Sequence, residues 1–163
     1  MLKRLVIVNS TPIIALAAID RLDILKALYG QVIIPKAVHD EIVFKEESIA
    51  KHALAKSNEW IITKSITNNE AKRFFKIQLH DGEVEVMILG KELEADLLII
   101  DDFTAREYAK HLDLKVTGTI GIILKAKEIG IISEVKPMIS KLIENGIYIS
   151  DKLFNDILIK AGE

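Results

Sequence analysis

Two adjacent carboxylates, Asp101 and Asp102, directly follow the apolar run LLII at residues 97–100. Four consecutive apolar residues are typical of a strand buried on both faces, as in a parallel sheet. The carboxyl ends of such strands form the edge at which open α/β sheets bind their ligands. Successive strand residues point to opposite faces, so at most one of the two carboxylates faces a crevice there, and we expect it to be Asp101.

Asn9 ends a second apolar run, at residues 5–8, and is therefore comparable in position to Asp101. Thr11 is suited to cap the helix that follows, with Pro12 at the first helical position. An asparagine at such a point is most commonly a turn residue whose side chain bonds its own backbone. A ligand role for Asn9 is the alternative.

Glu41 and Glu83 are two further acids at helix positions near strand ends. Glu41 shares the apolar stripe of a helix beginning after Pro35, where long acidic side chains usually reach out to water. Glu83 falls in the first turn of a helix beginning near residue 81, where the helix dipole favours an ionised carboxylate. Taken singly, Glu41 is explained as well by an ordinary helix acid as by a metal ligand, whereas for Glu83 the ordinary helix acid is the preferred explanation.

Composition excludes several classes of site. The chain has 163 residues, half of them hydrophobic, which predicts a single domain spanning residues 1–163. It has no cysteine, and its four histidines lack zinc-site spacing, so thiolate and zinc chemistry are disfavoured. With 22 Lys and Arg against 24 Asp and Glu, no global basic field exists to hold nucleic acid. The apolar runs are too short for a secretory signal or a membrane span, which favours the cytoplasm.

The order of the predicted elements indicates the fold class. Apolar strands are predicted at 5–8, 32–34, 60–63, 97–100 and 115–117, with amphipathic helices between them and two capped helices at the end. Strands that alternate with helices predict a mainly parallel sheet covered on both faces. The expected fold is therefore a three-layer α/β/α domain.

Six segments carry a resemblance to the PIN domain family, whose members bind magnesium or manganese and cut RNA. They are VIVNSTPIIALAAIDRLDIL, VIIPKAVHDEI, LHDGEVEVMILGKEL, LLIIDD, LKVTGTIGIILKAKEIGII and the tail at residues 147–163. Together they span nearly the whole chain. The likeness is closest to a bacterial and archaeal branch of PIN-like proteins that is related to the toxin ribonucleases of toxin–antitoxin pairs.

The resemblance implies a metal-dependent ribonuclease with Mg²⁺ or Mn²⁺ as cofactor. Carried over residue by residue, it implies metal ligation by Asn9, Glu41, Glu83, Asp101 and Asp102, and catalytic roles for Glu41, Glu83 and Asp101. We expect Ser10 and Thr117 to contact the metal ligands or their bound waters, rather than the metal itself, and so to hold them in position. Phosphate contacts are assigned to Arg106, Lys110, Lys125 and Lys127, although solvated helix faces explain such charges more often. RNA, an antitoxin protein and a second copy of the chain are the implied partners.

Asn9 departs from the family pattern, which usually has aspartate at this position. An amide oxygen still ligates a hard cation, but it brings no charge, so metal affinity falls. The alternative is therefore a PIN-like module that binds nucleic acid or protein without cutting. A phosphoacceptor domain that uses the Asp101–Asp102 pair is a weaker third interpretation, because such a pair would more naturally follow an early strand.

Overall fold

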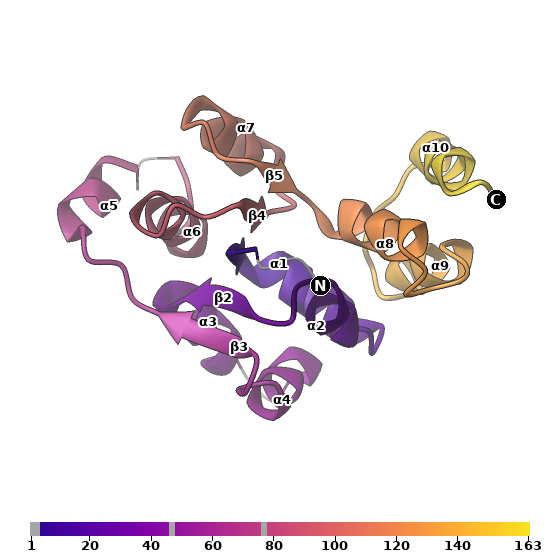
Figure 1. Cartoon of the computed structure of the whole chain (residues 1–163), viewed down its shortest axis with the longest axis horizontal. Helices are drawn as coiled ribbons and strands as arrows, with labels where there is room; N and C mark the ends of the chain where they lie inside the picture. The colour runs from indigo at the N-terminus through magenta and orange to yellow at the C-terminus, as the bar shows by residue number, and fades with distance from the viewer. Residues whose placement is uncertain (1–3, 46–47, 76–77) are drawn as a thin grey trace.

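A computed structural model describes residues 4–45, 48–75 and 78–163. Within them, five strands form one sheet in the order β3-β2-β1-β4-β5, and every neighbouring pair is parallel. The strands are β1 (Val6–Val8), β2 (Val32–Pro35), β3 (Ile61–Lys64), β4 (Leu97–Ile99) and β5 (Val116–Thr117). The expected parallel sheet is confirmed, and helices on both of its faces complete a three-layer α/β/α fold (Figure 1).

Ten helices are present in the described ranges. They are α1 (Ser10–Ala18), α2 (Asp23–Tyr29), α3 (Lys36–Val43), α4 (Ile49–Lys56), α5 (Asn69–Phe75), α6 (Asp81–Glu92), α7 (Phe103–His111), α8 (Thr119–Glu128), α9 (Lys136–Glu144) and α10 (Asp151–Ala161). Helix α6 packs against β1, β2, β4 and α3, whereas α8, α9 and α10 gather at the opposite end of the molecule from α5 (Figure 1). No helix in the described ranges is long and apolar enough to cross a membrane.

The unbroken apolar runs form the core because the central strands are covered on both faces. Val8, Leu98 and Ile99 are fully buried. At about 25 cal/mol per Å² of apolar surface, each such side chain contributes about 1.5–3 kcal/mol to folding. Burial therefore fixes the positions of the central strands, and with them the positions of the residues that directly follow each strand.

The start of α1 differs from the sequence expectation. The helix begins at Ser10 with Asn9 as its N-cap residue, two positions before Pro12, so the prediction that Thr11 caps it is wrong. The strand leads directly into the helix here. Pro12 is tolerated in the first turn because the first four N–H groups of a helix lack partners within it, so its missing N–H removes no helix bond.

Candidate functional site

The carboxyl ends of β1 and β4 bring Asn9 and Asp101 to one edge of the sheet. In the register of these two strands, Val8 lies opposite Ile99. The backbone N–H of Asn9 extends the pairing by donating to the carbonyl oxygen of Ile99 at 3.0 Å. Asn9 and Asp101 therefore leave the sheet from neighbouring positions.

The Asn9 side chain is buried, with 4% of the residue exposed. Among the described residues, its Oδ1 is the one buried side-chain oxygen or nitrogen without a hydrogen-bond partner. The expectation that this side chain bonds its own backbone is therefore wrong. An unpaired buried acceptor costs about 1–3 kcal/mol, so its presence needs a reason. A cation is one ligand that an amide oxygen can accept.

Gly82, in the first turn of α6, allows Asn9 and Glu41 to come together. A Cβ atom added at Gly82 would lie 3.3 Å from Oδ1 of Asn9 and 3.2 Å from Oε2 of Glu41. Both oxygens thus lie near the same point, although Asn9 follows β1 and Glu41 belongs to α3. Cγ2 of Val38 also lies 3.3 Å from that Cβ position, so the close approach of these groups depends on glycine having no side chain. Oε1 of Glu41 is 4.0 Å from Nζ of Lys45, a distant ion pair between exposed side chains.

Glu83 lies beside this point and experiences the charges around it. Burial raises the pKa of the Glu83 carboxyl, a hydrogen bond from the His80 backbone N–H at 3.1 Å opposes that rise, and repulsion from Asp102 and Glu41 adds to it. Like charges near one another disfavour the ionised form of each. The negative charges of Glu41 and Asp102 therefore both act on the Glu83 carboxyl.

Asp101 and Asp102 are held by the helices that follow them. Both carboxylate oxygens of Asp101 accept hydrogen bonds from Thr119, one from the backbone N–H at 2.7 Å and one from the hydroxyl at 2.6 Å. Asp102 caps α7 by accepting from the N–H of Ala105 at 2.8 Å. Glycine at position 118 permits the hydrogen bonds between Thr119 and Asp101, because a Cβ atom there would lie only 2.7 Å from Oδ1 of Asp101.

Thr119 and Glu85 have roles that sequence reasoning missed. Glu85 is buried in α6, where it accepts from the N–H of Ala37 at 3.1 Å and from Nζ of Lys72 at 2.6 Å. Ala37 lies one turn before Glu41, so Glu85 fixes the start of the helix that carries Glu41. A signal existed for Glu85, since residues 84–89 are apolar apart from it, which indicates a helix buried on most sides.

The oxygens next to Gly82 are one amide oxygen and one carboxylate oxygen, and both are types of ligand that divalent cations accept. No group of three or more His, Cys, Asp or Glu in the described ranges is arranged to hold a metal ion. Mg²⁺ usually keeps several waters and takes only one or two protein carboxylates. The unpaired oxygen of Asn9 and the carboxylate of Glu41, with Glu83 beside them, match that requirement.

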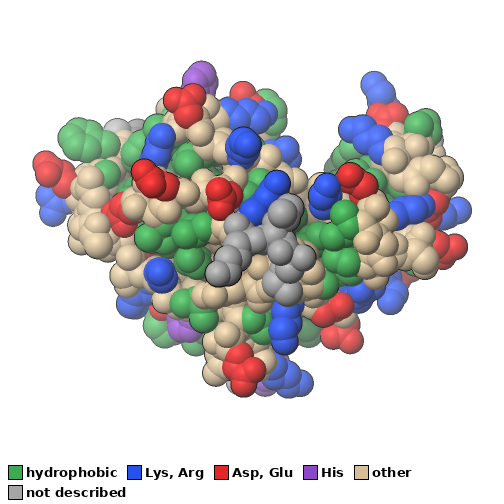
Figure 2. Space-filling model, viewed as in Figure 1, with side chains coloured by type: hydrophobic (Ala, Val, Ile, Leu, Met, Phe, Trp, Pro, Cys, Tyr) green, Lys and Arg blue, Asp and Glu red, His purple; other side chains and the backbone are tan. Residues whose placement is uncertain are grey.

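The contacts of the predicted supporting residues are those of ordinary packing and ion pairing. Ser10 is the buried first residue of α1, and Oγ1 of Thr117 lies against Gly121. Arg106 approaches the sheet edge, with one guanidinium nitrogen 3.2 Å from the Cβ position of Gly118. The three predicted lysines are all in ion pairs: Lys110 with Glu107, Lys125 with Glu128 and Lys127 with Glu163. Positive and negative side chains alternate on the face shown in Figure 2.

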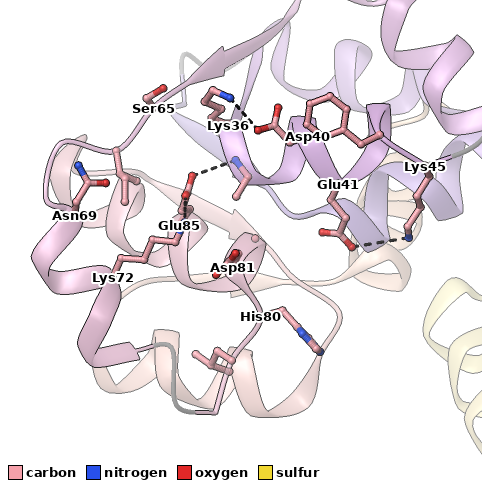
Figure 3. Close-up of a pocket in the computed structure, with 15 residues that line it drawn as sticks. Lys36, Asp40, Glu41, Lys45, Ser65, Asn69, Lys72, His80, Asp81 and Glu85 are labelled. Atoms are coloured by element: carbon pink, nitrogen blue, oxygen red, sulfur yellow. Dashed lines mark hydrogen bonds and ion pairs between the residues drawn. The ribbon is translucent and has the colours of Figure 1, made fainter.

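A groove of about 1110 Å³ adjoins the site between α3, α5 and α6 (Figure 3). Glu41 and Gly82 line its end next to the site, and Phe44, Ser65 and Asn69 lie along it. Lys72 and Glu85 form part of its wall through their ion pair (Figure 3).

Comparison with known proteins matches residues 5–163 to a family described as a PIN domain. The match covers nearly the whole chain, including every residue of the site described above. A comparison with curated proteins finds no match.

Proposed function

The chain belongs to the PIN domain family, a nuclease-like fold, and on this premise we propose that it is a metal-dependent ribonuclease that hydrolyses RNA phosphodiesters. PIN domains generally use divalent metal ions, and Mg²⁺ or Mn²⁺ is the proposed cofactor here. The observation that carries the proposal is the buried, unpaired Oδ1 of Asn9, which faces the same point as Oε2 of Glu41.

Asn9 and Glu41 would hold the ion, with Glu83 as the third oxygen donor and Asp101 and Asp102 completing the acidic edge. A bound ion of this kind activates water and stabilises the departing oxygen. In the ion-free protein, burial and repulsion from Asp102 and Glu41 raise the pKa of the Glu83 carboxyl, and a bound cation would offset that repulsion. Thr119 keeps Asp101 oriented through its two hydrogen bonds.

Arg106 is the proposed phosphate contact nearest the reacting group, because its guanidinium group and the Asp101 carboxylate both approach Gly118. Lys110, Lys125 and Lys127 would contribute farther along the RNA. The exposed ion pairs of Lys110 and Lys125 are worth about 0–1 kcal/mol each, so either lysine can exchange its carboxylate for a phosphate at little cost. Lys127 is held more firmly, because its side chain is 23% exposed and its partner Glu163 is 17% exposed.

The proposed biological role is that of the toxin in a toxin–antitoxin pair, with an antitoxin protein and a second copy of the chain as partners. Its support is the resemblance of the motif segments to that branch of the family. Purification from cells that co-express the neighbouring gene tests it. A stable complex that suppresses RNA cleavage is expected, whereas full activity in the presence of the neighbour's product would contradict the role.

A binding module without nuclease activity is the alternative that Asn9 itself favours. A neutral amide replaces the usual carboxylate, and no three-acid group is arranged for a metal in the described ranges. Such a protein would bind nucleic acid or protein through the same edge of the sheet.

Cleavage of single-stranded RNA with Mn²⁺ discriminates between the two functions. If the native protein cuts, and Glu83→Gln and Asp101→Asn each abolish cutting, the nuclease proposal holds. If the native protein is inactive and Asn9→Asp cuts, the binding module is favoured. Asn155→Asp, on the exposed face of α10, controls for the added negative charge. The Mn²⁺-induced rise in melting temperature should be larger for Asn9→Asp than for the native protein, because a charged ligand binds the ion more tightly.

A further inference from the structure

The groove between α3, α5 and α6 is continuous with the candidate site. Glu41 and Gly82 belong to both, since they face the unpaired oxygen of Asn9 and also line the groove. A polymer with a phosphate at the site would therefore extend into the groove. At about 1110 Å³ the groove is at or above the size of common small-molecule pockets, about 300–1000 Å³, so it has room for more than a single small ligand.

Phe44 gives this groove an aromatic surface. It lies at the end of α3 and is 79% exposed while lining the groove. Ser65 and Asn69 line the groove as well, and their hydroxyl and amide groups can donate and accept hydrogen bonds. An exposed ring with nearby hydrogen-bonding side chains suits a flat, polar-edged group such as a nucleobase, which stacks on aromatic faces.

Two lysines of the groove are free to exchange partners. Lys36 and Lys45 have side chains that are 60% exposed, and their ion pairs with Asp40 and Glu41 are of the surface kind that contributes about 0–1 kcal/mol (Figure 3). Either lysine can turn to a phosphate at little cost. Lys72, in contrast, is held by the buried carboxylate of Glu85 and belongs to the wall of the groove.

The charges of the groove also restrict the kind of nucleic acid. Its lysines are matched by acids, so the groove has no excess positive charge with which to hold a polyanion by charge alone. Affinity must come largely from contact with a base. In a duplex the bases are stacked and paired, whereas a single strand can turn one base out onto an aromatic ring.

We infer that this groove is a base-binding subsite for single-stranded nucleic acid, in which one unstacked base lies on the ring of Phe44 and the flanking phosphates contact Lys36 and Lys45. The inference rests on the proposed function, because it takes the polymer in the groove to be the one cut at the adjoining site.

Binding of a short, labelled single-stranded RNA by the full chain tests the subsite. The Asp101→Asn variant with Mn²⁺ serves as the uncut background, and fluorescence anisotropy gives Kd. Phe44→Ala should raise Kd about 5-fold or more, the loss expected when one base no longer stacks, while Phe44→Trp should keep the native value. Phe74→Ala is the matched control, because Phe74 is 76% exposed on α5 but does not line the groove.

Abasic scanning locates the base that stacks. RNAs that lack one base at successive positions are bound to the background protein and to the same protein with Phe44→Ala. Removal of the base from one position should weaken binding to the background protein by about 5-fold but leave the Phe44→Ala protein unaffected, because coupled partners are not additive. Independent losses at every position would contradict a contact between Phe44 and a base.

The results separate the subsite from the nuclease proposal. Equal Kd values for Phe44→Ala and its background, or equal affinity for the RNA and its duplex, would overturn the subsite even if the native protein cuts RNA. If the native protein fails to cut with Mn²⁺ while Phe44→Ala still weakens binding to single strands, the subsite stands and the nuclease proposal falls.

Discussion

The two halves of the candidate site differ in how their oxygens are satisfied. In one half, formed by the end of β1, α3 and the start of α6, Oδ1 of Asn9 is unpaired and lies next to Gly82 together with Glu41. In the other half, formed by β4, α7 and α8, the carboxylate of Asp101 is bonded twice to Thr119 and that of Asp102 caps a helix. We call the first the open half, because its amide oxygen lacks a partner, and the second the fixed half, because its carboxylates are hydrogen-bonded.

Under the proposed function, the difference means that one side of the site is pre-organised and the other side receives the ion. A fixed carboxylate orients whatever binds beside it without reorganisation during the reaction. An unpaired buried oxygen, in contrast, is costly until a ligand arrives, and binding then recovers that cost. The predictions below test this division, beginning with the largest expected effect.

Of the changes considered below, removal of the charge from Glu41 should have the largest effect, because it leaves the open half with neutral amide oxygens at Asn9 and at position 41. Glu41→Gln is expected to lower the rate of Mn²⁺-dependent RNA cleavage about 100-fold or more, since loss of even an indirect partner of a metal ligand costs about 10–100-fold. Glu107→Gln, which alters only an exposed pair with Lys110, is the control. Full activity in Glu41→Gln would exclude Glu41 from the metal site.

Thr119→Val should weaken the fixed half without changing the size of the side chain much. It removes the hydroxyl that donates to Asp101, so the variant is expected to lose about 1–3 kcal/mol of folding free energy, measured by urea unfolding. Thr119→Ser keeps the donor and should lose less. An unchanged unfolding midpoint in Thr119→Val would show that the fixed half does not depend on this bond.

Gly82→Ala should damage the open half selectively. The added methyl group would enter the space between Asn9 and Glu41, so the affinity for Mn²⁺ is expected to fall about 10-fold, the scale of a perturbed metal-ligand shell. Gly90→Ala is the control in the same helix, because its methyl group would press on Leu98, 3.0 Å away, and should lower stability alone. If both variants keep native Mn²⁺ affinity by calorimetry, the space at Gly82 is not the ion site.

The smallest expected effect is the pH dependence of metal binding. Because the pKa of the Glu83 carboxyl is raised in the folded chain, protons compete with Mn²⁺ at higher pH than they would at an ordinary glutamate. The affinity should fall as the pH drops through that raised pKa. In the metal-free protein the sign is opposite: the protonated form of Glu83 favours folding at low pH, and this contribution is lost as the pH rises through the folded pKa.

Glu83→Gln isolates this effect because glutamine can still accept from the His80 N–H. In the variant, the Mn²⁺ affinity and the stability of the metal-free protein should each lose the pH dependence that Glu83 contributes. Melting curves with and without Mn²⁺ across the acidic range measure both. If the native protein and the variant give parallel curves, Glu83 does not titrate in this way.

The sheet and the positions of the strand ends could be predicted from sequence, whereas the directions of the side chains could not. Unbroken apolar runs specify buried parallel strands, and Asp101 follows such a run in the sequence as it does in the fold. That Asp101 is bonded to Thr119 depends on where α8 begins, 18 residues later. Local patterns contain no information about such a distant partner.

Asn9 shows the limit most clearly. Its sequence neighbours indicate a turn residue with a self-satisfied side chain, which is the more frequent case. The structure instead leaves Oδ1 unpaired, and the groups that share its surroundings at Gly82 come from α3 and α6. Only the packing of three separate segments determines that outcome.

The outer strands of the sheet limit how two copies of the chain can associate. β5 has two residues, and β3, at the other border, has four and ends in Lys64. Short edge strands, and a lysine on an edge strand, disfavour pairing with a strand from another chain. A dimer joined through these edge strands would gain few backbone hydrogen bonds, so the sheet edges are a poor surface for self-association.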